Sequence, residues 1–118
     1  MKKIVLLIIA CLCTINSNGE VVNVDGINYE INLIEKTAKV SKSPLFSGEL
    51  VIPSSIIYNN VNYKVTGIGM SAFDCTNVQS VVISNGVTNI EAWAFRGCSN
   101  LVSIVIPPSI NSMRMVNL

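Results

Sequence analysis

Apolar and polar residues alternate with a period of two along residues 20–65, which predicts β-strands rather than helices. The dipeptide Asp25-Gly26 separates two such runs, and it predicts a β-hairpin because both central positions of this tight turn need positive φ. In the second strand of that hairpin, one face is apolar and consists of Tyr29, Ile31 and Leu33. A third strand is expected over residues 38–42, after a polar turn.

A second hairpin is expected around Asn59-Asn60, between residues 56–58 and residues 61–65. Asparagine tolerates the left-handed backbone region better than other non-glycine residues, which suits a tight turn. Residues 20–64 are therefore predicted to form a region of β-hairpins that caps the rest of the chain.

From residue 65 the hydrophobic pattern repeats itself, once over residues 65–86 and once over residues 87–109. The matched positions lie 22 or 23 residues apart: Ile68 and Ile90, Ala72 and Ala94, Phe73 and Phe95, Cys75 and Cys98, Asn77 and Asn100, Val78 and Leu101, and Ile83 and Ile106. One residue fewer before Cys75 than before Cys98 explains the change of spacing.

Two further segments carry pieces of the same pattern. Residues 50–56 match residues 104–110 as an earlier half-copy, and residues 110–118 begin a degenerate partial copy. A unit of about 23 residues cannot bury its own apolar face, whereas stacked units can. The repeats, over residues 65–118, therefore predict a β-rich solenoid with short helical or 3₁₀ turns, preceded by the N-terminal β-hairpins.

In each repeat, the segment that contains the Ala-Phe pair is expected to form the side of the solenoid opposite the strands. Residues 91–95 have a helical pattern, and Gly97 is placed to end it. Phe73 and Phe95 are expected to fill this wall from adjacent coils.

Two pairs of polar or sulfur-bearing residues take equivalent places in the two repeats. Cys75 and Cys98 are predicted to be buried free thiols, with a disulfide or a reactive or metal-binding role as the alternatives. Asn77 and Asn100 are expected at a bend, where their amides bond backbone groups of adjacent coils.

Composition removes most classes of enzyme. The chain has no histidine, which excludes Ser-His-Asp and Cys-His nucleophile systems and every zinc site that contains histidine. A hydrolase that works with carboxylates alone is the remaining alternative, but the repeat places no two of the acidic residues face to face. We therefore expect no catalytic residue, no cofactor and no metal. The net charge of +1 gives no nucleic-acid footprint either.

The first nineteen residues have the order of a secretory signal peptide. Lys2 and Lys3 precede an apolar run over residues 4–15, and small residues follow, which predicts cleavage after residue 19. The run is too short to span about 30 Å of hydrocarbon. The chain is therefore expected to be secreted or held at the cell surface, with a lipoprotein anchored through Cys11 as the second interpretation.

The repeats resemble the BspA-like leucine-rich repeat. The resemblance rests on Val-Thr-Gly-Ile-Gly-Met-Ser-Ala-Phe-Asp-Cys at residues 65–75 and on Val-Thr-Asn-Ile-Glu-Ala-Trp-Ala-Phe-Arg-Gly-Cys-Ser-Asn-Leu at residues 87–101, followed by Ile-Val-Ile-Pro. It extends over about residues 20–112. It implies a curved solenoid in a secreted or surface protein of an anaerobic bacterium, a role in adhesion or host-protein recognition, and no catalytic residue.

Outward-facing strand positions are the expected contact surface, because a rigid scaffold presents them in columns. The candidate protein-contact residues are Val51, Ser80, Val82, Trp93, Ser103 and Val105. The row of three valines is a candidate apolar stripe, although valine also suits strands for steric reasons alone. Trp93 is either an exposed aromatic anchor or a side chain packed against the next coil.

Two functions remain open at this point. The first is a non-enzymatic protein that binds a host extracellular or matrix protein. The second is a truncated repeat remnant without binding activity of its own. The apolar residues 110–118 also predict self-association through the C-terminal end, because an uncovered strand edge is a template for pairing.

Overall fold

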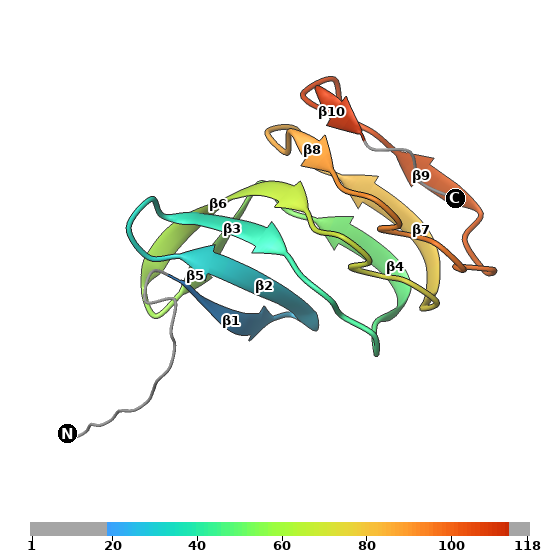
Figure 1. The fold of residues 1–118 in the computed structure, drawn as a ribbon, viewed down its shortest axis with the longest axis horizontal. Coiled ribbons are helices and arrows are strands. Elements are labelled where there is room, and N and C mark those ends of the chain that lie inside the picture. Colours follow the sequence, from blue (N-terminus) through green and yellow to red (C-terminus); the bar gives the residue numbers. More distant parts are fainter. Residues whose placement is uncertain (1–18, 114–118) are drawn as a thin grey trace.

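The structure, a computed structural model, describes residues 19–113, and within that range it is built from strands and turns without a helix (Figure 1). The strands are β1 (Gly19–Val24), β2 (Ile27–Asn32), β3 (Thr37–Val40), β4 (Ser47–Ile52), β5 (Ser55–Tyr58), β6 (Val61–Ile68), β7 (Asn77–Ile83), β8 (Asn89–Ile90), β9 (Ser103–Val105) and β10 (Ser112–Met113). The predicted signal peptide lies almost entirely outside the described residues, as do residues 114–118 of the partial copy.

The strands form two sheets. A seven-stranded sheet has the order β1-β2-β3-β6-β8-β10, with β5 paired to β6, and we name it the long sheet. A three-stranded sheet has the order β4-β7-β9, and we name it the short sheet. Figure 1 shows the chain passing from one sheet to the other and back, so that each pass lies beside the one before it.

Both predicted hairpins are confirmed. Val24 pairs with Ile27 around the first turn, where Asp25 and Gly26 have φ of 54° and 86°. The second turn joins β5 to β6, and both of its asparagines lie in the left-handed region. The third strand is also present and pairs antiparallel with β2.

Equivalent residues of successive repeats lie side by side in parallel strands. In the short sheet Val81 of β7 pairs with Ile104 of β9, and in the long sheet Ile68 of β6 pairs with Ile90 of β8. The partial copy continues this order, because Met113 of β10 pairs with Ile90. The stacking of repeats that the spacing predicts is therefore present in both sheets.

The predicted aromatic core is confirmed. Phe73 and Phe95 are fully buried, and their rings stack with centroids 5.6 Å apart and planes 7° from parallel. Phe46, from the loop before β4, meets Phe73 edge-on at 5.9 Å. A ladder of rings thus connects the N-terminal region to the second repeat.

The helical pattern at residues 91–95 gives turns, so this prediction is wrong. Trp93 has a φ of 61°, as its equivalent Ser71 has a φ of 57°, and a left-handed residue ends a right-handed helix. The N–H groups of Ser71, Phe73 and Cys75 instead donate to carbonyls of the next repeat, at Ala92, Ala94 and Arg96 respectively. The backbone groups that a helix would pair within itself therefore hold neighbouring repeats together.

The expected equivalence of the two cysteines is also wrong. Cys75 instead matches Gly97, because both have positive φ, at 60° and 74°. Cys75 is exposed. Cys98 is half-buried and lies above Thr76: the Cys98 thiol and the Thr76 hydroxyl both donate to the carbonyl of Phe73, at 3.0 and 2.9 Å. Both thiols are free, as predicted, but the predicted burial is wrong, because Cys75 is exposed and Cys98 is only half-buried.

The residue that lengthens the second repeat is accordingly Ser99, because Thr76 and Cys98 are 22 apart while Asn77 and Asn100 are 23 apart. The Asn100 amide donates to the Asn77 side-chain oxygen at 3.3 Å, on the exposed surface. The asparagines therefore bond each other rather than the backbone groups that the sequence suggested.

Candidate functional site

The three predicted valines form one exposed column on the short sheet. Val51 pairs with Val82, and Val82 pairs with Val105, across three parallel strands. Their exposed fractions are 57 %, 43 % and 55 %. The residues next to them in β4 and β7, such as Leu50 and Val81, are buried in the core. We call these three residues the valine column.

A polar column runs beside the valine column. It consists of Glu49, Ser80 and Ser103, which pair across the same strands. Glu49 and Ser103 are exposed, and Ser80 is half-buried. Five of the six predicted contact residues, all except Trp93, therefore lie together on one face of the short sheet.

Trp93 lies elsewhere, on the turns that connect β8 to β9. Its side chain is 42 % exposed, and the guanidinium of Arg96 lies 4.9 Å from the centre of its ring. Arg96 in turn forms an ion pair of 2.6 Å with Asp74 of the preceding repeat. Trp93 is thus a surface side chain whose neighbours are charged, and it is separate from the valine column.

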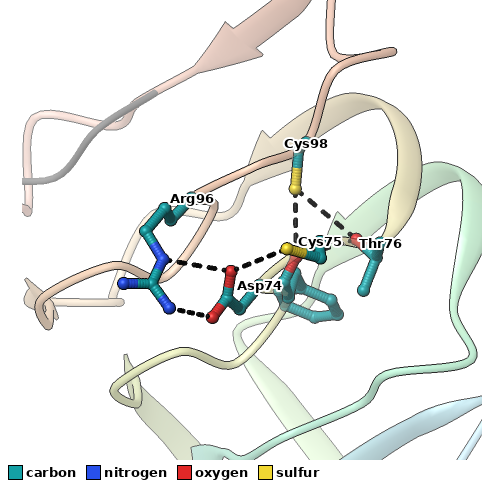
Figure 2. A network of polar contacts seen from close by, with 6 residues as sticks. Asp74, Cys75, Thr76, Arg96 and Cys98 are labelled. Carbon is teal, nitrogen blue, oxygen red and sulfur yellow. Dashed lines mark hydrogen bonds and ion pairs between the residues drawn. The ribbon is translucent and has the colours of Figure 1, made fainter.

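The Asp74–Arg96 pair continues to the exposed cysteine (Figure 2). The hydrogen bond from Arg96 lowers the pKa of Asp74, so this carboxylate stays ionised. The Cys75 thiol donates to Asp74 at 3.3 Å, and this hydrogen bond is the main reason why the pKa of Cys75 is raised. A raised pKa leaves less thiolate at neutral pH, and the thiolate is the nucleophilic form. The arrangement therefore suppresses the reactivity of Cys75.

A groove lies at the N-terminal end of the short sheet, and the sequence did not predict it. Its volume is about 620 Å³, and strands β2, β4 and β5 contribute to its lining together with the tip of the first hairpin. Tyr29 lies at this groove, and burial, together with the nearby Asp25 carboxylate, raises its pKa to about 12. The sequence predicts the first hairpin, but it does not predict how far that hairpin lies from β4, and this distance determines the groove.

Between residues 19 and 113, no three side chains of His, Cys, Asp or Glu gather as a metal site would require. In the same range, no helix has the length and apolarity needed to cross a membrane.

Comparison with known proteins identifies the repeats. The family described as "BspA type Leucine rich repeat region (6 copies)" matches residues 30–116. No curated protein matches the sequence.

Three solved structures resemble the fold. A leucine-rich repeat protein from Bacteroides capillosus is 26 % identical, with a TM-score of 0.69 over 80 % of this chain and 87 % of that one. A leucine-rich repeat protein from Bacteroides ovatus is 33 % identical, with a TM-score of 0.68 over 75 % of this chain. A leucine-rich cell surface protein from Faecalibacterium prausnitzii, 24 % identical over 82 % of this chain, has a TM-score of 0.62 and supports the fold alone.

The match to the last two proteins covers only 24 % and 26 % of their own lengths. The family profile, by contrast, covers the greater part of this chain, from β2 to beyond β10. Together with repeats that stack in the register their spacing predicts, this match assigns the protein: the chain belongs to the BspA-type leucine-rich repeat family.

Proposed function

We propose that this chain is a non-enzymatic binding protein of the leucine-rich repeat type, exported to the cell surface or beyond it, and that it contacts another protein through the valine column. Its stacked repeats form a solenoid segment that holds the contact residues rigid. The observation that carries the proposal is the register of Val51, Val82 and Val105, which exposes three apolar side chains in one row.

The physical support is the contrast between the valine column and its polar surroundings. Apolar side chains that are exposed in a row, with the serines Ser80 and Ser103 alongside, resemble the apolar centre and polar rim of a protein interface. Because the strands are fixed by the core beneath them and valine has few rotamers, little conformational entropy is lost on binding. A patch of three valines is small, which favours a weak, reversible contact that gains strength when it is repeated.

The sequence supports export. The order of basic, apolar and small residues at positions 1–19 is that of a signal peptide.

The test is binding of the purified chain to immobilised extracellular matrix proteins and mucin. The Val82→Lys variant places a charge in the middle of the valine column and should abolish binding. Ile34→Lys is the matched control, because Ile34 is an exposed apolar residue of the β2–β3 turn, away from the short sheet. Equal loss in both variants, or binding that Val82→Lys leaves unchanged, would contradict a contact through the valine column.

The second candidate, a repeat remnant without binding activity, makes the opposite prediction for the same experiment. The observation that favours it is the poor covering of the last described repeat: Leu101 and Ile104 are half-buried, whereas the equivalent Val78 and Val81 are fully buried. Failure of the unaltered chain to bind any matrix protein or mucin would favour this candidate.

The same observation supports a proposal about assembly. We infer that the end of the stack at β9 and β10 pairs with a second copy of the chain. Among the described strands, these two are the last members of their sheets, and apolar side chains of the last repeat lie next to them.

A further inference from the structure

The two sheets end differently on the N-terminal side of the stack. The long sheet continues past β3 through β2 and then β1, whereas the short sheet stops at β4 (Figure 1). Among residues 19–113, no strand pairs with one edge of β4, at the end where two further strands extend the other sheet. An edge strand offers unpaired backbone donors and acceptors that another extended segment can use.

The direction of the free backbone groups follows from the pairing with β7. Ser84 N–H donates to the carbonyl of Ile52 at 3.0 Å, so Ile52 turns its backbone toward β7. In a parallel ladder the alternate residues of a strand face opposite neighbours. Glu49 and Val51 therefore direct their N–H and C=O groups away from β7, toward the free edge.

The groove described above lies along this edge. Glu49, Val51 and Pro53 form one side of it, and the other side comes from the tip of the first hairpin and from β5. The apolar lining comprises Val24, Ile27, Phe46, Ile56 and Ile57, besides Tyr29. The ionisable lining groups other than Tyr29 are the carboxylates Asp25 and Glu49, and no lysine or arginine of the described part of the chain lines the groove.

We propose that the groove binds an extended segment of a partner protein, which adds to β4 as a further strand of the short sheet and alternates apolar side chains with lysine or arginine. The free edge supplies main-chain hydrogen bonds, the apolar lining accepts the side chains that face it, and the two carboxylates attract the basic ones. This mode of binding uses the edge of the sheet rather than its face, so it goes beyond the function proposed for the valine column.

The geometry favours a single strand over a second copy of this chain. Another copy would have to extend both sheets at once, as successive repeats do. At this end β2 and β1 extend the long sheet two strands beyond β3, so its edge strand is not level with β4 and a second copy could not extend both sheets together.

The experiment selects random seven-residue peptides on the immobilised full chain. The enriched peptides should alternate apolar residues with lysine or arginine. Synthetic copies should bind the Asp25→Asn/Glu49→Gln double variant at least about tenfold more weakly, because two attractive charges are lost while asparagine keeps the left-handed turn position. Their binding to the unaltered chain should also weaken as salt is raised.

Two backbone tests separate strand addition from a loose electrostatic contact. Methylation of alternate backbone nitrogens in a selected peptide should abolish binding in one register and leave it in the other, because only one set of N–H groups faces β4. Val51→Pro removes a donor at the free edge, where proline is tolerated, and should weaken binding at least about tenfold without unfolding the protein. If this variant fails to fold by circular dichroism, the methylated peptides decide the question.

The inference would be overturned if no peptide is enriched, if peptides bind the double variant as tightly as the unaltered chain, or if both methylation registers bind equally. Val82→Lys keeps this inference apart from the proposed function, because Val82 lies outside the groove. Peptides that fail to bind Val82→Lys but still bind Val51→Pro and the Asp25→Asn/Glu49→Gln double variant would place the contact on the valine column and reject the strand addition.

Discussion

The stacked rings of Phe73 and Phe95 have no exposed surface, so truncation of either ring would leave a cavity between two repeats. We expect Phe95→Ala to lower the free energy of unfolding by about 3–5 kcal/mol, and Phe73→Ala by a similar amount, because lost burial and an unfilled cavity add. Urea denaturation measures the change. Leu45→Ala is the control and should have almost no effect, since Leu45 is exposed. Losses below about 1 kcal/mol at both phenylalanines would contradict this core.

The exposed thiol of Cys75 should respond to its neighbour Asp74. The hydrogen bond to Asp74 raises the thiol pKa, so Asp74→Asn should lower that pKa and increase the thiolate fraction at neutral pH. Alkylation of Cys75 by iodoacetamide, followed by mass spectrometry between pH 7 and 9, should therefore be faster in Asp74→Asn than in the unaltered chain. Cys98 in the same samples is the internal control. An unchanged or slower rate at Cys75 would contradict the assigned hydrogen bond.

Residue identity alone predicted the aromatic core but assigned the cysteines wrongly. Phe73 and Phe95 are matched wherever the extra residue of the second repeat is placed, because that residue follows both rings. Its place, before Cys98 or at Ser99, decides whether Cys75 matches Cys98 or Gly97. That choice depends on which residue adopts positive φ, and sequence spacing carries no information on it.

Among the elements, the turns between the sheets depend most on backbone conformation. Gly97 has a φ of 74°, and a side chain there would have its Cβ 2.7 Å from the Cys75 sulfur. Gly97→Ala should cost about 1–2 kcal/mol, chiefly from the left-handed backbone, because the exposed sulfur can rotate away. In a double-mutant cycle measured by urea denaturation, Cys75→Ala should recover only a small part of this loss. Full recovery would show that the contact, and not the backbone, is the cause.

The hairpins were predictable because their turns carry local signals, Asp25-Gly26 and Asn59-Asn60, that need no information from the rest of the chain. The helix expected over residues 91–95 is absent because the partners of its backbone groups lie in another repeat. Its backbone N–H and C=O groups are used between repeats, as in the bond from Phe73 to Ala94, and a local pattern does not reveal such partners.

At the scale of the molecule, the proposed pairing through β9 and β10 predicts concentration-dependent association. Sedimentation velocity of the chain from residue 20 onward should show the average mass rising with concentration, because Leu101 and Ile104 become more buried in the complex. Grafting one further repeat and a polar cap after residue 110 should abolish the effect. A strictly monomeric species at all concentrations, with a cooperative thermal transition, would reject the proposed pairing.

The valine column could be predicted from the sequence because a repeat fixes which residues share a column once the strands are parallel. The groove beside β4 could not be predicted from the sequence. It lies where the long sheet continues through β2 and β1 while the short sheet ends at β4, and this difference depends on how the N-terminal hairpins pack against the repeats. Tyr29 and Asp25 carry strand and turn signals only, so neither was distinguishable as part of a groove.

The unequal ends of the two sheets also bear on the order in which the chain folds. Strands β1, β2 and β3 pair residues that are close in sequence, such as Val24 with Ile27, whereas the short sheet pairs Val51 with Val82. Short loops cost less entropy to close than long ones, so refolding should start in the N-terminal hairpins and advance one repeat at a time. During synthesis the hairpins also emerge first. Copies added or lost at the far end would then leave the rate-limiting nucleus untouched, and the number of repeats could vary without loss of the ability to fold.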